Sequence, residues 1–229
     1  MNRFLLLLSL CGLLAAPMMA DDNEARIKAM FEARKSASYP AQAFSAVTSM
    51  AVGQWVVYGL TDDDGERTIM RNAIIAHEGD EWTTQMTMIN EDDVVIMQFT
   101  FKGLDAARRS GDADELEITR MALKTNDDEP MVMDGMMLSM VKGMYGKNLQ
   151  GMTTKTTIEG DAGALTVVAG TFNGTTKAKS ETSMTGSSEE TTSWMHPAVP
   201  VYGVVKSTSS DEMTMELLDF GMTGAKPSF

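Results

Sequence analysis

Methionine is the residue type whose number and spacing point most directly to chemistry in this chain, which has 22 of them among 229 residues. Three pairs have a single residue between two methionines: Met86 and Met88, Met131 and Met133, and Met213 and Met215. Paired thioethers are soft ligands that suit Cu(I). No His or Cys accompanies these pairs, however, and a spacing of two is also the ordinary period of a strand. We therefore expect no tight Cu(I) site and no metal centre.

Methionine is also flexible and polarisable, so it fills irregular interiors and adapts to varied apolar guests. Two interpretations follow from this property. The methionines either replace Leu in an ordinary core, or they line a cavity that accepts an apolar ligand. The residues that we expect to line such a cavity are Trp82, Met86, Met88, Met97, Phe99, Met133, Met137, Met140 and Met144.

The residue types needed for catalysis are sparse. The only two histidines are His77, beside a predicted turn, and His196, which precedes Pro197. Neither lies in a nucleophile elbow, a zinc-binding helix motif or a phosphate-binding loop. The acidic runs at 62–66 and 126–129 lack the spacing of a twelve-residue calcium loop, so they are better explained as hairpin tips. The sequence therefore predicts a protein that is not an enzyme and has no cofactor.

The first twenty residues have the layout of a secretory signal peptide. Arg3 provides a positive start, residues 4–14 form an apolar run, and small residues lead to Ala20 before Asp21. The run of about 11 apolar residues is too short to span a bilayer core. We expect cleavage after Ala20, which leaves residues 21–229 as a single exported, periplasmic or secreted domain without a transmembrane anchor.

Cysteine and charge restrict the mature protein further. The only cysteine, Cys11, lies inside the leader, and Leu10 before it does not suit lipid modification, so the mature chain has no disulfide or thiol chemistry. Without Arg3, 18 basic and 32 acidic residues give the mature chain a net charge of −14. A field of this sign disfavours nucleic acids and anionic membrane surfaces as partners.

The elements that position these residues follow from the periodicity. Residues 21–36 have helical spacing and charges that suit a helix dipole. Residues 51–125 alternate with a period of two and are interrupted by turn residues, which predicts an antiparallel meander with one covered side. We expect a loop at 103–114 within it. Strands resume at 165 and continue to 220.

A second helix is predicted at residues 130–147, between the two meanders. Pro130 suits its first turn, and an apolar stripe runs along one side, although Gly135 and Gly143 weaken the helix. A twisted sheet of about nine or ten strands curls. The predicted fold is therefore mainly β (α+β): a curved antiparallel half-barrel, with an N-terminal helix and the Met-rich helix covering its concave face.

Residues 169–221 carry a resemblance to a known fold. The segment has a glycine-led strand, a strand ending in Trp194-Met195, the corner Pro197-Ala198-Val199-Pro200, the strand Gly203-Val204-Val205-Lys206 and the closing residues 217–221, LLDFG. This arrangement resembles uncharacterised bacterial exported proteins of the periplasmic lipoprotein-carrier-like type. The resemblance implies a half-barrel around a helical lid, and the well-studied members carry acylated lipoproteins or lipids.

The sequence thus predicts an exported, non-enzymatic protein with two alternative functions. In the first, a Met-lined cavity holds lipid or another apolar or acylated ligand. In the second, the core is filled and the protein has a structural or envelope-interaction role. The sequence does not fix the ligand, the partner or the oligomeric state.

Overall fold

The computed structural model describes residues 22–44, 49–110, 116–140, 153–184 and 187–229. Its helical segments are α1 (Asn23–Glu32), α2 (Leu104–Ser110) and a short turn at residues 135–140. Its strands are β1 (Ser38–Tyr39), β2 (Trp55–Thr61), β3 (Arg67–Glu78), β4 (Glu81–Ile89), β5 (Val94–Lys102), β6 (Glu117–Thr125), β7 (Met131–Met133), β8 (Thr153–Asp161), β9 (Leu165–Val167), β10 (Gly170–Phe172), β11 (Thr176–Met184), β12 (Ser187–Met195), β13 (Val204–Ser209) and β14 (Thr214–Gly221).

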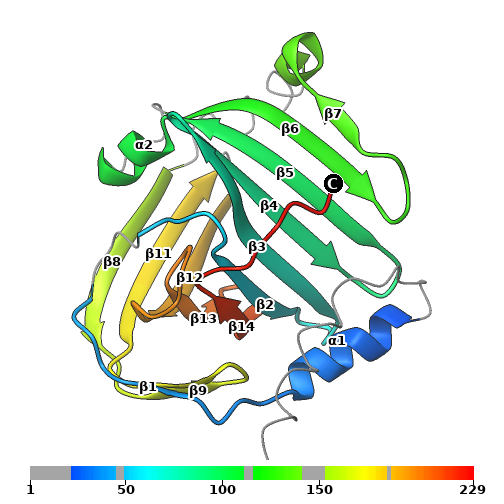
Figure 1. Cartoon of the computed structure of the whole chain (residues 1–229). Coiled ribbons are helices and arrows are strands. Elements are labelled where there is room, and N and C mark those ends of the chain that lie inside the picture. The colour runs from blue at the N-terminus through cyan, green and yellow to red at the C-terminus, as the bar shows by residue number, and fades with distance from the viewer. Residues whose placement is uncertain (1–21, 45–48, 111–115, 141–152, 185–186) are drawn as a thin grey trace, which may run out of the picture.

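The main sheet has eleven antiparallel strands in the order β7-β6-β5-β4-β3-β2-β14-β13-β12-β11-β8. The two predicted meanders join where β14 pairs with β2. A second sheet of three strands has the order β1-β10-β9. The mainly β class and the antiparallel sheet are confirmed (Figure 1). The main sheet is not closed or strongly curled, so it lacks the curvature that we expected of a half-barrel.

The acidic run at 62–66 and the segment 90–93 form tight turns between neighbouring strands. In the β2–β3 turn, Asp62 accepts a hydrogen bond from the Glu66 backbone N–H at 2.8 Å, and Gly65 has φ +85°. In the β4–β5 turn, the Asn90 side chain accepts hydrogen bonds from the backbone N–H groups of Asp92 and Asp93. Short polar side chains that bond to nearby backbone stabilise such turns.

The main sheet has two covered faces, which we call the α1 face and the α2 face. Side chains alternate between them along each strand. On the α1 face, Ile27 of α1 packs with Val57, Ile69 and Leu218 of the sheet. The C-terminal segment crosses the same face over β3, β4 and β5, where Ala225 packs against Ala73 (Figure 1).

The α2 face carries the largest buried cluster of the described residues. Val56 and Tyr58 of β2 and Leu217 of β14 pack against Phe172 of the small sheet. The phenol of Tyr58 donates a hydrogen bond to the Val204 backbone oxygen at 3.1 Å, and burial raises the pKa of this phenol. The small sheet therefore covers part of the α2 face.

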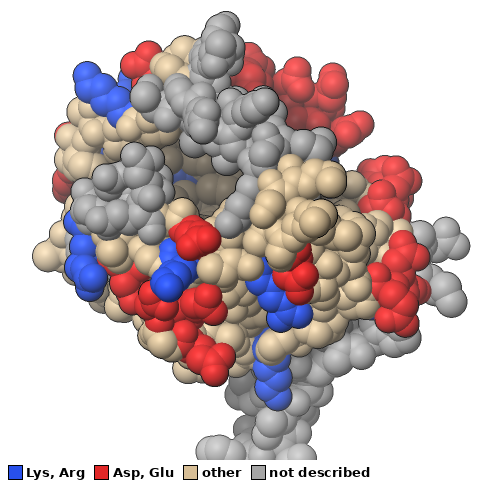
Figure 2. Space-filling model, turned by 90° about the horizontal axis from the view of Figure 1, so that it is seen from above, with Lys and Arg blue, Asp and Glu red and all other residues tan. Residues whose placement is uncertain are grey.

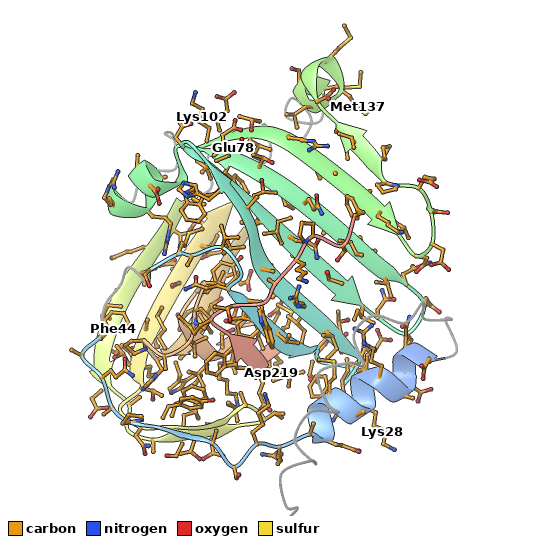
Figure 3. All side chains as sticks on the ribbon, viewed as in Figure 1. Lys28, Phe44, Glu78, Lys102, Met137 and Asp219 are labelled. Atoms are coloured by element: carbon orange, nitrogen blue, oxygen red, sulfur yellow. The ribbon has the colours of Figure 1, made fainter. Side chains whose placement is uncertain are left out.

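The structure corrects the predicted Met-rich helix at 130–147. Residues 131–133 form β7 instead, because Met131 and Met133 pair with Leu123 and Met121 of β6. The helical turn begins only at Gly135, and the positive φ of this residue, +46°, is not that of an extended strand. Met137 lies on the exposed turn, away from the sheet (Figure 3). This turn does not cover the sheet, and residues 141–147 lie outside the described residues.

Three further boundaries differ from the prediction. The N-terminal helix occupies Asn23–Glu32 only. The predicted loop at 103–114 contains α2. Residues 153–161 form β8, which pairs with β11 at one edge of the main sheet. The predicted leader, residues 1–20, lies outside the described residues.

Candidate ligand-binding cavity

A cavity of about 470 Å³ lies on the α2 face. The space-filling view from above shows a hollow in the surface of the molecule (Figure 2). The cavity is lined by Met50, Asn72, Ile74, Thr84, Met86, Phe99, Phe101, Leu104, Arg108, Val201 and Tyr202. Most of these side chains are apolar. Its volume lies within the range of about 300–1,000 Å³ typical of small-molecule sites.

Three neighbouring strands form the sheet wall of the cavity. Each contributes two residues separated by one position, because alternate side chains share a face. These residues are Asn72 and Ile74 of β3, Thr84 and Met86 of β4, and Phe99 and Phe101 of β5. The Phe99 and Phe101 rings stack, with centroids 5.9 Å apart. Ile74 and Asn72 are buried, so they form the floor.

Helix α2 forms the second wall. Leu104 and Arg108 are four residues apart, which places them on the same side of a helix, and both line the cavity. Burial lowers the pKa of Arg108, while the nearby Asp105 carboxylate raises it. An arginine guanidinium remains charged at neutral pH despite such a shift. Among the described residues that line the cavity, Arg108 is the only charged one.

Trp82 attaches α2 to the sheet. Its indole N–H donates a hydrogen bond to the Asp105 carboxylate at 3.1 Å. The Trp82 ring also stacks on the His77 ring, with the two ring centroids 3.7 Å apart. Trp82 is itself buried, so the position of α2 depends on a side chain fixed in the sheet.

The third wall comes from the connection between β12 and β13, where Val201 and Tyr202 lie. His196 anchors this connection. The His196 ring Nδ1 accepts a hydrogen bond from the Ala198 backbone N–H, and Nε2 lies 3.1 Å from the Pro40 backbone oxygen. A neutral ring with this pair of partners carries its proton on Nε2. Val201 has φ +66°, a strained conformation for a β-branched residue.

The nine residues expected to line a cavity are placed as follows. Met86 and Phe99 line the cavity on the α2 face. Met88 and Met97 are half-buried and are not among its lining residues, and Trp82 supports α2. Met133 is buried on β7, whereas Met137 and Met140 are exposed, with exposed fractions of 49% and 65%. Met144 lies outside the described residues.

Other lining residues were not identified from the sequence. Leu104 and Arg108 fell in a predicted loop, and the short segment LDAARRS carries little apolar periodicity. Met50 and Val201 lie before the first residues of β2 and β13, so strand alternation does not predict which way their side chains face. Phe101 could have been identified from the sequence, because the period of two places it on the same face of the strand as Phe99.

The described residues contain no group of three or more His, Cys, Asp or Glu side chains placed to hold a metal ion. In the pair of Met131 and Met133, Met133 is buried while Met131 is exposed. No helix in the described part of the chain is long and apolar enough to cross a membrane.

No family model matches the sequence, and no curated protein is significantly similar to it. Among solved structures, the chain is similar to one titled "Structure of PNGF-II in P21 space group", with 12% sequence identity and a TM-score of 0.32. The match covers 77% of this chain and 29% of that one, so the chain spans less than a third of its length.

Proposed function

We propose that the protein is an exported, non-enzymatic periplasmic protein that binds lipid or another apolar or acylated ligand in the cavity on the α2 face. The observation that supports this proposal most directly is a space of about 470 Å³ with mostly apolar walls. Small-ligand sites are concave, largely apolar and equipped with a few polar groups. The cavity meets each of these conditions.

The chemistry of the walls favours a flexible apolar ligand. Met50 and Met86 can change rotamer to follow the shape of a guest, while Phe99 and Phe101 provide a rigid apolar surface. Each methylene group moved from water into such a site contributes about 0.8 kcal/mol. An alkyl chain gains affinity with each added methylene until the cavity is full.

Export is the second part of the proposal, and it rests on the leader-like residues 1–20 and the absence of cysteine after Cys11. Expression of the full chain in a bacterial host with fractionation tests it. We expect a periplasmic product whose intact mass corresponds to a chain beginning at Asp21. A cytoplasmic, full-length product would contradict export without bearing on the cavity.

Binding is tested by titrating the protein with phenylnaphthylamine, whose fluorescence rises in apolar surroundings. We expect saturable binding that Met86→Trp weakens, because the larger indole fills the cavity. Met88→Trp is the matched control, since Met88 is also half-buried on β4 and shares the face of Met86 without lining the cavity. Urea unfolding of both variants establishes that they fold.

The competing function is a structural or envelope-interaction role that requires no small ligand. Absence of saturable binding to the unmodified protein would favour that alternative. Equal loss of binding in Met86→Trp and Met88→Trp, with both variants folded, would place the probe elsewhere and contradict the proposed site.

A further inference from the structure

We propose that the Asn72 carboxamide binds the polar end of the ligand on the floor of this cavity. The ligand is an apolar molecule that carries an uncharged amide group, which both donates and accepts hydrogen bonds. This inference rests on the proposed function and specifies its ligand class. It is carried by the position, the burial and the hydrogen-bonding state of one polar side chain.

Asn72 occupies an otherwise apolar part of the main sheet. It lies on β3, and its register partners on β2 and β4 are Val56 and Met86. Met70 and Ile74 are the next residues on the same face of β3, because alternate side chains share a face. These four neighbours are apolar, and none is a strong hydrogen-bonding partner for an amide. The sheet itself therefore supplies Asn72 with no polar side chain at the adjacent positions.

The Asn72 side chain is buried, yet it has no hydrogen bond to any residue that the structure describes. It is only 7% exposed, and it lines the cavity. By contrast, the buried Gln85 on the opposite face donates a hydrogen bond to the Ser228 hydroxyl. Buried polar groups are nearly always hydrogen-bonded, and one without a partner lowers stability. The amide of Asn72 therefore points to a partner that enters the cavity.

The groups that Asn72 offers define the polar end of that partner. Its carbonyl oxygen accepts hydrogen bonds, and its NH2 group donates them. A ligand amide is complementary, since its N–H can donate to Asn72 Oδ1 while its carbonyl oxygen accepts from Asn72 Nδ2. A carboxylate would leave Oδ1 unpaired, and burying its charge against an apolar floor is costly. A purely apolar ligand would displace water from Asn72 without replacing its hydrogen bonds, which loses affinity.

The remaining part of the ligand meets apolar walls. Met86, Phe99 and Phe101 line the cavity on the strands that follow β3 in the sheet. Tyr202, which also lines the cavity, is 51% exposed and so lies toward the mouth. An amide on the floor thus leaves the apolar body of the ligand between the methionine and the two phenylalanine rings, with its far end directed toward Tyr202.

The test uses ligands that share one apolar body: butylbenzene, para-butylbenzamide and para-butylbenzoate. The mature protein is titrated with each by calorimetry. Asn72→Leu keeps the approximate volume of the side chain and removes its hydrogen-bonding groups. We expect it to weaken para-butylbenzamide binding at least about tenfold and to leave butylbenzene affinity within about twofold, because only the amide loses hydrogen bonds. The unmodified protein should bind para-butylbenzoate more weakly than the amide.

Met70→Leu is the matched control, because it introduces the same side chain on the same face of β3 at a residue that does not line the cavity. We expect it to leave the ratio of amide to butylbenzene affinity unchanged. An equal fall of this ratio in both variants would overturn the inference, as would an unchanged ratio in Asn72→Leu or tighter binding of the benzoate. In these cases the proposed function stands, whereas binding of none of the three ligands would contradict both.

Urea unfolding separates a binding role of Asn72 from a structural one. Replacing an unpaired buried amide with an apolar side chain of similar size does not remove a hydrogen bond from the folded protein. The unfolding midpoint of Asn72→Leu should therefore equal or exceed that of the unmodified protein. A marked fall in this midpoint would show that Asn72 supports the fold, and it would overturn the inference.

Discussion

The side chain of Gln85 on β4 forms a reciprocal pair with Ser228 near the end of the chain. The Gln85 Nε2 group donates to the Ser228 hydroxyl at 2.8 Å, and Gln85 Oε1 accepts the Ser228 backbone N–H at 2.9 Å. Gln98 extends the network by donating to Gln85 Oε1 and to the Phe229 backbone oxygen. Two glutamines on the α1 face thus hold the C-terminal segment across the sheet.

Replacement of Gln85 by Ala is expected to lower the free energy of unfolding by about 1–3 kcal/mol, because it removes three hydrogen bonds made by a buried side chain. Ser228→Ala removes one hydroxyl and keeps the backbone donor, so its cost should be nearer about 0.5–1.5 kcal/mol. Urea unfolding measures both values. Hydrogen exchange of residues 225–229 should increase in Gln85→Ala, and unchanged protection would contradict the role of Gln85.

Gly59 is expected to be required for the docking of α1. A Cβ atom at this position would lie 2.3 Å from the Phe31 ring Cζ, while Arg67 lies over the same ring, 4.7 Å from its centroid. Gly59→Ala should therefore cost about 1–3 kcal/mol through overpacking. Gly59 does not need a positive φ, so the ring is the main obstacle to a methyl group.

A double-mutant cycle separates this overpacking from an effect on the strand. In the Phe31→Ala background, the ring is gone and Gly59→Ala should be neutral or stabilising by up to about 1 kcal/mol, since alanine orders a strand at lower entropic cost. If Gly59→Ala costs the same in both backgrounds, Phe31 is not the obstacle.

Tyr58 should make the protein sensitive to alkaline pH. Burial raises the pKa of this phenol in the folded state, and Tyr202 adds to the effect. In the unfolded chain the phenol ionises near pH ~10. Above that pH the unfolded state loses a proton that the folded state retains. The free energy of unfolding therefore falls by about 1.4 kcal/mol per pH unit because of this group. Below that pH its contribution is constant.

Tyr58→Phe should show a shallower decline above pH ~10 when stability is measured by urea unfolding across the alkaline range. At neutral pH it should lose about 0.5–1.5 kcal/mol, because the hydrogen bond to Val204 is gone. Parallel declines for the two proteins would show that Tyr58 does not cause the alkaline loss.

The helical turn at 135–140 offers a comparison between two neighbouring positions. Leu138 is 5% exposed, whereas Met137 is 49% exposed. Leu138→Ala should cost about 2–5 kcal/mol as a buried large-to-small change. Met137→Ala should stay within about 0.5 kcal/mol, as exposed substitutions do. Thermal or urea unfolding measures both, and a core-sized loss at Met137 would contradict its exposed placement.

The period of two in the sequence was sufficient to predict the strands of the first meander. It succeeded because the alternating faces of β4 and β5 meet different environments: Gln85 meets the C-terminal segment, and Met86 meets the cavity. The same pattern placed Met86 and Phe99 on one face, which is the part of the cavity that local sequence determines. The sequence therefore predicted that Met86 and Phe99 share a face, but it did not predict the other walls of the cavity.

The parts that sequence patterns missed depend on contacts between distant residues. The methionines at 131–140 fit helical spacing, yet hydrogen-bonded pairing of Met133 with Met121 makes the first of them a strand. Helix α2 is held by the bond from Trp82 to Asp105, which no periodicity in 104–110 reveals. Tyr202 reaches the cavity from a connection positioned by His196 and Pro40. Such placements follow from tertiary packing, which overrides local propensity.

The two ends of the main sheet bear on the behaviour of the protein at high concentration. No other strand in the described part of the chain pairs beyond β7 or β8. β7 has only three residues, and β8 exposes Lys155 and Glu159 beside its free edge. Charged side chains on an edge strand and a very short pairing length both discourage edge-to-edge polymerisation. The open sheet can therefore remain colloidally stable without closing into a barrel.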